Sequence, residues 1–203
     1  MRNALTAAIA LATAWAVPVQ AQTAPAPAGE KDAGGGIMDK AVNKIGANWS
    51  FYGPNQTSKM MKGADVVGGQ FVRVKVTAKG ANVWDVGAIS PIQKPIAAGD
   101  TVLVAIWMRA PELQNGETMP LPMIGANGAA APYDNLVKSD VKITNAWKLY
   151  YASGKASTNF PGNSANVTVH LASDKHVVDL GPVFVLDFGQ NYTGALPDNN
   201  DPQ

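Results

Sequence analysis

The stretch GDTVLVAIWMRA, residues 99–110, decides the fold class of this chain. After the turn residues Gly and Asp, its side chains alternate, with apolar residues alone on one face and with Trp107 and Arg109 at the end of the other. A period of two is typical of a β-strand that has one face in a core and one toward solvent. The stretch therefore predicts a sheet that is buried on one side.

The same alternation recurs along the chain, between turns rich in Gly, Pro, Asn and Asp. In residues 165–172, Asn166, Thr168 and His170 alternate with apolar residues. Pro120 and Pro122 place a weaker strand at a sheet edge, because proline donates no backbone hydrogen bond. Strands are expected at residues 70–77, 82–89, 101–110, 119–124, 137–144, 147–153, 165–172 and 177–188. Without internal repeats or βαβ units, this pattern predicts an all-β fold, an antiparallel β-sandwich.

The ends of the chain differ in composition from this middle part. Residues 1–21 are predicted to be a cleaved secretory signal peptide, because a basic start precedes a short apolar run and the small-residue site VQA. Residues 22–36, rich in Pro, Ala and Gly, are predicted to be a disordered linker. The folded domain is expected at 37–195, beginning with one or two helical turns at 37–45, and residues 196–203 are expected to fray. These features predict a secreted or periplasmic protein.

The composition argues against several classes of protein. There is no cysteine, so an exported domain of this kind has to rely on a hydrophobic core rather than on disulfides. The formal net charge of +1 gives no support to a nucleic-acid partner. No stretch after the signal peptide has the ~20 apolar residues of a membrane-spanning helix. No cofactor motif is present, and the two histidines, His170 and His176, lack metal-ligand spacing.

The order of the stretches QFVRVKV, VWDVGAI, GDTVLVAIWMRAPE, VKITNAWKLYYASGKAS, ANVTVHLAS and VVDLGPVFVLDFG resembles a known family. Over residues 48–189 the chain is similar to the galactose-binding-like jelly-roll domains classed as carbohydrate-binding modules. The resemblance implies a jelly-roll β-sandwich that binds polysaccharide without catalysis. It also implies a carbohydrate-active enzyme as a partner, although this chain would be a free-standing module.

The resemblance also raises the question of a structural calcium ion. It makes Asp187, near the end of the last strand, a candidate calcium ligand. The chain departs from the family at ANWSFYG, residues 47–53, where such modules often carry an Asn-Gly-Asp-Phe-Glu-like strand. Calcium needs six to eight oxygen ligands, and one aspartate does not make a site. The sequence therefore predicts no bound cofactor, with calcium at Asp187 as the weaker alternative.

The outward-facing side chains are the candidates for a sugar site. Sugars are bound by flat aromatic rings against their C–H faces and by planar polar groups against their hydroxyls. Trp107 and Arg109 fit this on one strand, and His170 joins them if the strands share one sheet. This row is predicted to be the centre of the site, so that Trp107→Ala abolishes binding. The alternative is that Trp107 is covered by a loop or by residues 37–45, with Arg109 stacked or paired there.

The other aromatic residues are less decisive. Trp84, next to Asp85, suits either sugar binding or packing, since its alternation partners are apolar. Tyr133, in the loop APYDN, is a candidate for the edge of a groove. Trp147 opens a strand and is expected in the core.

Three functions follow from these patterns. The first is a secreted, non-catalytic module that binds polysaccharide by aromatic stacking and hydroxyl hydrogen bonds. The second is a periplasmic or cell-surface adaptor that uses the same face for a protein partner. The third and weakest is a polysaccharide-acting hydrolase or lyase, which needs two converging carboxylates. Glu112 and Glu117, both in one polar loop, do not form such a pair by spacing alone.

Overall fold

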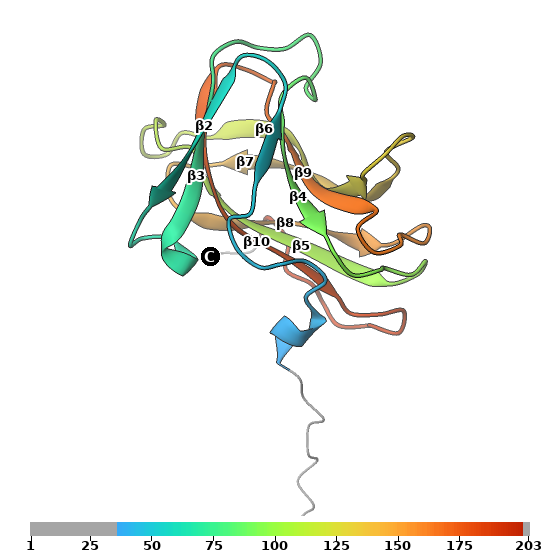
Figure 1. Ribbon diagram of the computed structural model, residues 1–203. Helices are drawn as coiled ribbons and strands as arrows, with labels where there is room; N and C mark the ends of the chain where they lie inside the picture. The colour runs from blue at the N-terminus through green and yellow to red at the C-terminus, as the bar shows by residue number, and fades with distance from the viewer. Residues whose placement is uncertain (1–35, 201–203) are drawn as a thin grey trace, which may run out of the picture. The chain divides into compact units, whose positions relative to one another are not determined.

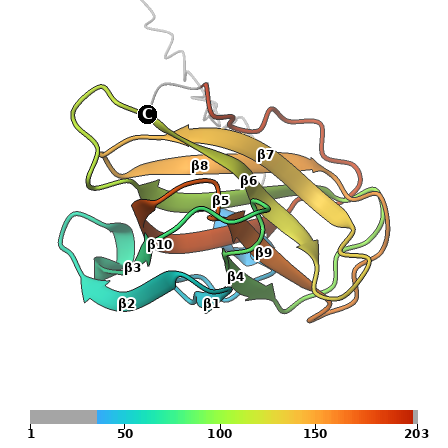
Figure 2. The same ribbon diagram turned by 90° about the horizontal axis from the view of Figure 1, so that it is seen from above.

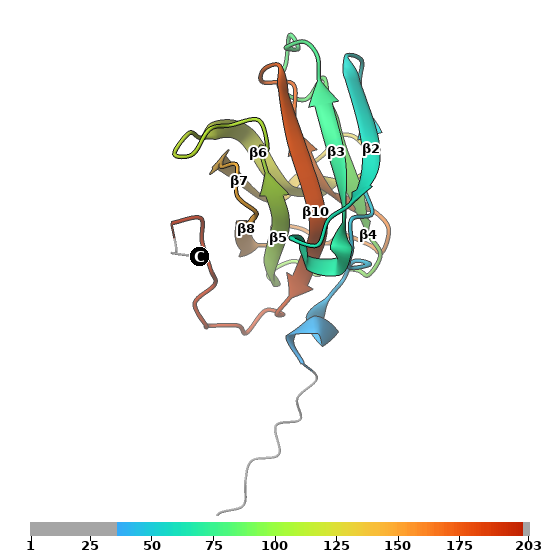
Figure 3. The same cartoon turned by 90° about the vertical axis from the view of Figure 1, so that its left-hand side faces the viewer.

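Two five-stranded antiparallel sheets lie face to face in the computed structural model, which describes residues 36–200 (Figures 1 and 2). The first sheet has the order β1 (Ser50–Tyr52), β4 (Gly87–Ile92), β9 (Ala165–His170), β6 (Met119–Gly128) and β7 (Asn135–Ile143). The second has the order β2 (Gln56–Lys62), β3 (Gln70–Val76), β10 (His176–Asp187), β5 (Thr101–Arg109) and β8 (Lys148–Lys155), and Figure 3 views it from outside. The predicted antiparallel β-sandwich is confirmed.

Helical structure is limited to two short 3₁₀ turns, η1 (Ile37–Lys40) and η2 (Val67–Gly69). Within residues 36–200, no helix has the length and apolar character to cross a membrane. The predicted signal peptide, and the predicted linker except for its last residue, Gly36, lie outside the described residues.

The core lies between the two sheets and is built from the apolar stripes that the alternation predicted. On β5, Val102, Val104, Ile106 and Met108 are fully buried, as the pattern of residues 99–110 requires. Burial of about 25 cal/mol per Å² of apolar surface is the main force that holds two such sheets together. The core closes where β7 and β8, from opposite sheets, lie side by side (Figure 2).

The segment predicted to be helical at 37–45 is mostly extended, which corrects that prediction. After η1 the chain passes between the sheets: Ala41 bridges to β10 of the second sheet, and Asn43 bridges to β4 of the first. The buried Asn43 amide donates to the Val183 carbonyl at 3.0 Å and accepts from the Val185 amide at 2.7 Å. Pairing with the two sheets satisfies this backbone better than an isolated short helix would.

Two further strand predictions need correction. β6 is an internal strand between β9 and β7, not the edge strand predicted at 119–124. Its prolines, Pro120 and Pro122, lie before Ile124, where pairing with β9 begins, so no bond to β9 is lost. The strand predicted at 82–89 begins only at Gly87, which leaves Trp84 in the preceding loop.

The last described residues, 196–200, are held against the domain rather than frayed. Leu196 packs on a small cluster formed by Ala41, Leu103 and Leu186 on the outer face of the second sheet. The Asn199 side chain accepts from the Tyr151 amide at 2.7 Å and donates to the Tyr151 carbonyl at 2.9 Å. Asn199 thus hydrogen-bonds the backbone of β8, an edge strand of the second sheet.

Candidate functional site

A groove crosses the outer face of the first sheet, and its floor is made of residues that are neighbours across strands. One row runs from Tyr52 on β1 through Gly87 on β4 to His170 on β9. Another runs through Asn166, Asn127 and Asn135, on β9, β6 and β7 respectively. Adjacent strands are about 4.8 Å apart, so the three asparagines form a continuous polar row. The cavity over this floor has a volume of about 690 Å³.

The row from Tyr52 to His170 has a glycine, Gly87, at its centre, and the Tyr52 side chain needs the space above it. A Cβ on Gly87 would lie 2.3 Å from the hydroxyl oxygen of Tyr52, so the Tyr52 side chain lies over Gly87. Burial raises the pKa of the Tyr52 phenol, and the neighbouring Tyr133 adds to the rise. Tyr52 therefore remains a neutral hydroxyl group at ordinary pH, able to donate and to accept a hydrogen bond.

Trp84 stands in the loop between β3 and β4 and borders the groove. Its side chain is 56% exposed, and its ring meets that of His170 edge-on, with centroids 6.4 Å apart. Asp85 fixes the loop: its carboxylate accepts from the Asn82 amide at 2.8 Å, and this bond lowers the pKa of Asp85. The Val83 carbonyl accepts from the Ala172 amide, which joins the loop to the chain after β9. Trp84 is thus an exposed aromatic residue on a well-anchored loop.

Tyr133 borders the groove from the loop between β6 and β7. It has a φ of 59°, and its ring is 58% exposed. The loop is closed by backbone bonds from Tyr133 to Ala130 and from Gly128 to Asp134. Trp84 and Tyr133 border the same cavity, and exposed aromatic rings gathered at a concave site are typical of ligand grooves. Trp84 and Tyr133 are therefore the two candidate stacking surfaces of the site.

The polar groups of the groove are uncharged. Thr168 donates to Asn127 at 2.5 Å, which orients that amide. Asn135, Asn166 and His170 have no hydrogen-bond partner for their side chains within residues 36–200, so they are available to a ligand. Burial lowers the pKa of His170, so its ring is neutral at pH 7. Among residues 36–200, no Asp, Glu, Lys or Arg lines the cavity.

Sequence reasoning found three of the groove residues and missed others. His170, Trp84 and Tyr133 were predicted and all line the cavity. Asn127 and Asn135 were missed, because nothing in the sequence indicated that β6 and β7 share a sheet with β9. The outward positions of Asn166 and Thr168 were visible in the alternation of residues 165–172, but their role depended on those neighbours.

Trp107 and Arg109 do not join His170, and the expectation of a single row is wrong. Both lie on β5 in the second sheet, whereas His170 lies on β9 in the first, with the core between them. Alternation indicates which side chains face away from the core, but both sheets have an outer face. Trp107 is half-buried. Its side chain lies against Gly181, since a Cβ added to Gly181 would be only 2.9 Å from the Cβ of Trp107.

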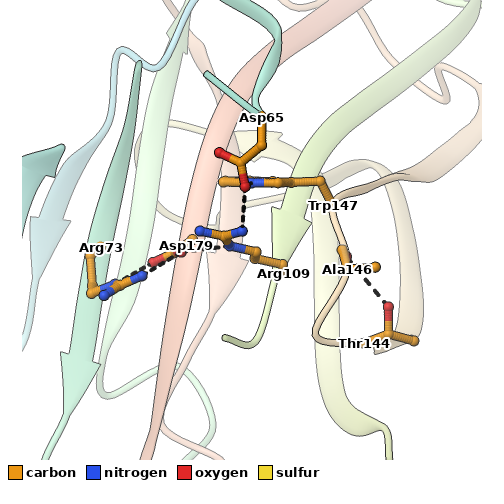
Figure 4. A network of polar contacts seen from close by, with 7 residues as sticks. All are labelled: Asp65, Arg73, Arg109, Thr144, Ala146, Trp147 and Asp179. Carbon is orange, nitrogen blue, oxygen red and sulfur yellow. Dashed lines mark hydrogen bonds and ion pairs between the residues drawn. The ribbon is translucent and has the colours of Figure 1, made fainter. Parts of the chain in front are cut away.

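Arg109 belongs to an ion-pair network on the second sheet (Figure 4). Asp179, which is fully buried, accepts from Arg109 at 2.9 Å and from Arg73 at 2.7 and 2.9 Å. Arg109 also donates to Asp65 at 2.7 Å and lies over the ring of Trp147, 4.7 Å from its centroid. Trp147 is half-buried on this outer face rather than in the predicted core, and its indole donates to Asp65 at 3.2 Å.

Asp187 lies beside another carboxylate. Burial raises its pKa, and the neighbouring Asp100 adds to the rise. One Asp187 oxygen accepts from the Gly189 amide at 2.8 Å. Within the described part of the chain, no group of three or more His, Cys, Asp or Glu residues is placed to hold a metal ion. Calcium at Asp187 stays a prediction.

Solved structures share this architecture at low sequence identity. No protein-family model matches the chain, and no curated protein matches its sequence. A solved structure described as "CBM4 structure and function" aligns with 69% of this chain and 94% of its own, at a TM-score of 0.52 and 15% identity. The CBM22-1 xylan-binding domain of Paenibacillus barcinonensis Xyn10C aligns with 72% of this chain and 96% of its own, at a TM-score of 0.50 and 10% identity.

The chain has the fold of a carbohydrate-binding module. A cellulose-binding domain of Cellulomonas fimi β-1,4-glucanase C adds a third example, with a TM-score of 0.50, 17% identity, and coverage of 74% of this chain and 97% of that one. The match to an arabinose-bound α-L-arabinofuranosidase, at a TM-score of 0.52, spans only 26% of that longer protein. The predicted resemblance to carbohydrate-binding modules is confirmed at the level of the fold.

Proposed function

We propose that this chain binds an uncharged polysaccharide in the groove of the first sheet and does not change it chemically. The observation that carries the proposal is the composition of the groove: exposed Trp84 and Tyr133 stand over a floor of asparagine, threonine and neutral histidine side chains. Aromatic rings suit the C–H faces of pyranose rings, and neutral amides and hydroxyls suit sugar hydroxyls. A carboxylate or sulfate group on the sugar would find no cation among the lining residues.

Xylan and cellulose are the first polymers to test. The CBM22-1 domain is described as xylan-binding and the C. fimi domain as cellulose-binding, and both have this fold. Pull-down on insoluble xylan and cellulose, followed by calorimetry with xylo- and cello-oligosaccharides, measures the proposed activity. Binding to neither polymer, nor to other neutral glycans on an array, would contradict it.

The alternative functions have less support. A protein adaptor needs a flat apolar patch of several hundred Å², whereas the exposed rings here border a concave cavity. A glycoside hydrolase by the usual route needs two carboxylates across the scissile bond, and none is among the described residues that line the groove. Secretion and association with a carbohydrate-active enzyme remain parts of the proposal, in keeping with the predicted signal peptide.

Binding in this groove is expected to weaken in acid because of His170. Its ring is neutral at pH 7, and burial holds its pKa below the ordinary 6.5 or so. Protonation places a positive charge in a groove without carboxylates, and a bound sugar excludes the water that would solvate it. Affinity is therefore expected to be constant above pH 6.5 and to fall as the pH drops below the lowered pKa. Calorimetry between pH 5 and 8 measures this.

The matched variant for this test is His170→Gln, which keeps a hydrogen-bonding side chain and removes the titration. Its affinity is expected to be independent of pH over the same range. An equal loss of affinity in both proteins at low pH would show that another group is responsible.

A further inference from the structure

Two asparagines of this chain are followed directly by glycine, in the pairs Asn115–Gly116 and Asn127–Gly128. Such a pair is chemically labile, because glycine has no side chain to hinder the approach of its own backbone nitrogen to the asparagine side chain. The first pair lies in the loop between β5 and β6. The second lies at the end of β6 and lines the groove. The structure therefore places the same dipeptide in two contrasting settings.

Spontaneous deamidation of such a pair begins with the glycine nitrogen. This nitrogen attacks the Cγ carbon of the asparagine, the bond from Cγ to Nδ2 breaks, and ammonia leaves with the proton that the glycine nitrogen loses. Water then opens the cyclic imide at one of its two carbonyl carbons, which yields aspartate or isoaspartate without oxidation or reduction. A backbone N–H that is held in a hydrogen bond within a strand is a poor nucleophile, because it has to lose that bond and turn before it can react.

The pair in the β5–β6 loop is open to this reaction. Asn115 and Gly116 are both exposed, and Gly116 has a φ of 87°. In the part of the chain that the structure describes, no acceptor forms a hydrogen bond with the Gly116 N–H. The Oδ1 atom of Asn115 accepts from Nδ2 of Asn145 at 2.8 Å. This donor stabilises the negative charge that develops on the oxygen during attack at Cγ.

The pair in the groove is held by its neighbours. Asn127 pairs with both β7 and β9, and the Gly128 N–H donates to the Asp134 carbonyl at 2.9 Å. The Oδ1 atom of Asn127 also accepts a hydrogen bond, from Thr168, so the two pairs differ in the glycine nitrogen and not in the carbonyl group. Reaction at Asn127 therefore requires the end of β6 to open locally.

We propose that Asn115 is a site of spontaneous modification, at which water converts the amide to aspartate and isoaspartate, and that the fold protects Asn127 from the same reaction. The inference goes beyond the proposed function, because it does not depend on a ligand of the groove. It has a consequence for the groove all the same. Deamidation of Asn127 would place a carboxylate on an uncharged floor, whereas Asn115 lies outside the groove lining.

Peptide mapping of the full chain after incubation at mildly alkaline pH tests this proposal. Glu117 lies between the two asparagines, so cleavage after glutamate separates them, and mass spectrometry measures the conversion of amide to acid on each peptide. In the folded protein, conversion at Asn115 is expected to be more than roughly tenfold faster than at Asn127, which has to wait for local opening. In guanidinium chloride, which unfolds the chain, the two rates are expected to become nearly equal.

The matched variant is Asn115→Gln, which keeps an amide but lengthens the side chain, so that ring closure is less favourable. It is expected to remove the conversion from its peptide and to leave Asn127 unchanged. Persistence of the conversion in this variant would assign it to another residue of that peptide. Equal rates at the two asparagines in the folded protein would show that β6 gives no protection, and conversion of Asn115 only in guanidinium chloride would show that the loop is protected too. Each of these three results would overturn the proposal.

Discussion

Trp84→Ala is expected to weaken polysaccharide binding by about 2 kcal/mol, or roughly thirty-fold, without unfolding the protein. The indole is 56% exposed at the border of the groove, so its removal takes away stacking area and leaves the core intact. Calorimetry with an oligosaccharide that the wild type binds measures the loss. Tyr133→Ala is expected to act in the same direction from the opposite loop.

Trp107→Ala is the matched control for this prediction. Trp107 also faces away from the core, but it lies on strand β5 of the second sheet. The affinity of the Trp107→Ala variant for the oligosaccharide is expected to equal that of the wild type. If Trp107→Ala abolishes binding and Trp84→Ala does not, the site lies on the second sheet and the groove is not the binding surface.

The largest expected effect on stability is at Asp179. Its carboxylate is fully buried and joins Arg73 and Arg109, so Asp179→Ala leaves two guanidinium groups without their shared partner. Removal of one member of a fully buried ion pair costs about 3–5 kcal/mol, and the loss here is expected toward the lower end because the side chains of Arg73 and Arg109 are 37% and 19% exposed. This is a large part of the roughly 5–15 kcal/mol that stabilises a typical domain. Urea denaturation of the variant measures the loss.

Asp65→Ala is the control from the same network. Asp65 bonds Arg109 at 2.7 Å, but its side chain is 58% exposed, and exposed ion pairs contribute about 0–1 kcal/mol. The two variants therefore each remove a carboxylate that pairs with Arg109, one buried and one exposed. Equal losses of stability in Asp179→Ala and Asp65→Ala would contradict the assignment of Asp179 as the buried centre of the network.

The sequence was sufficient for the fold class and for the inner faces of the strands. The alternation on β5 and β9 predicted which side chains enter the core, because burial on one face of a strand imposes a period of two. In the proline-containing strand β6 and in the short segment 37–45, pairing with distant strands decided the conformation. β6 can be an internal strand because Pro120 and Pro122 lie before the residues that pair with β9. Residues 41–43 are extended because they pair with strands of both sheets.

The site was only partly predictable, because strand order is a long-range property. An outward position on a strand says nothing of the sheet to which the strand belongs, so Trp107 and Arg109 were grouped with His170 across the core. Trp84 and Tyr133 lie on loops whose course depends on anchoring bonds such as those of Asp85 and Gly128. The row of asparagines exists only because β9, β6 and β7 are neighbours.

One NMR titration tests the central claim most directly. The indole N–H signals of Trp84, Trp107 and Trp147 report the two outer faces of the sandwich in a single spectrum, while xylohexaose or a cello-oligosaccharide is added. We expect the Trp84 signal to shift and saturate, with Trp107 and Trp147 unchanged. A saturable shift at Trp107 or Trp147 with Trp84 unchanged would contradict the groove as the binding site.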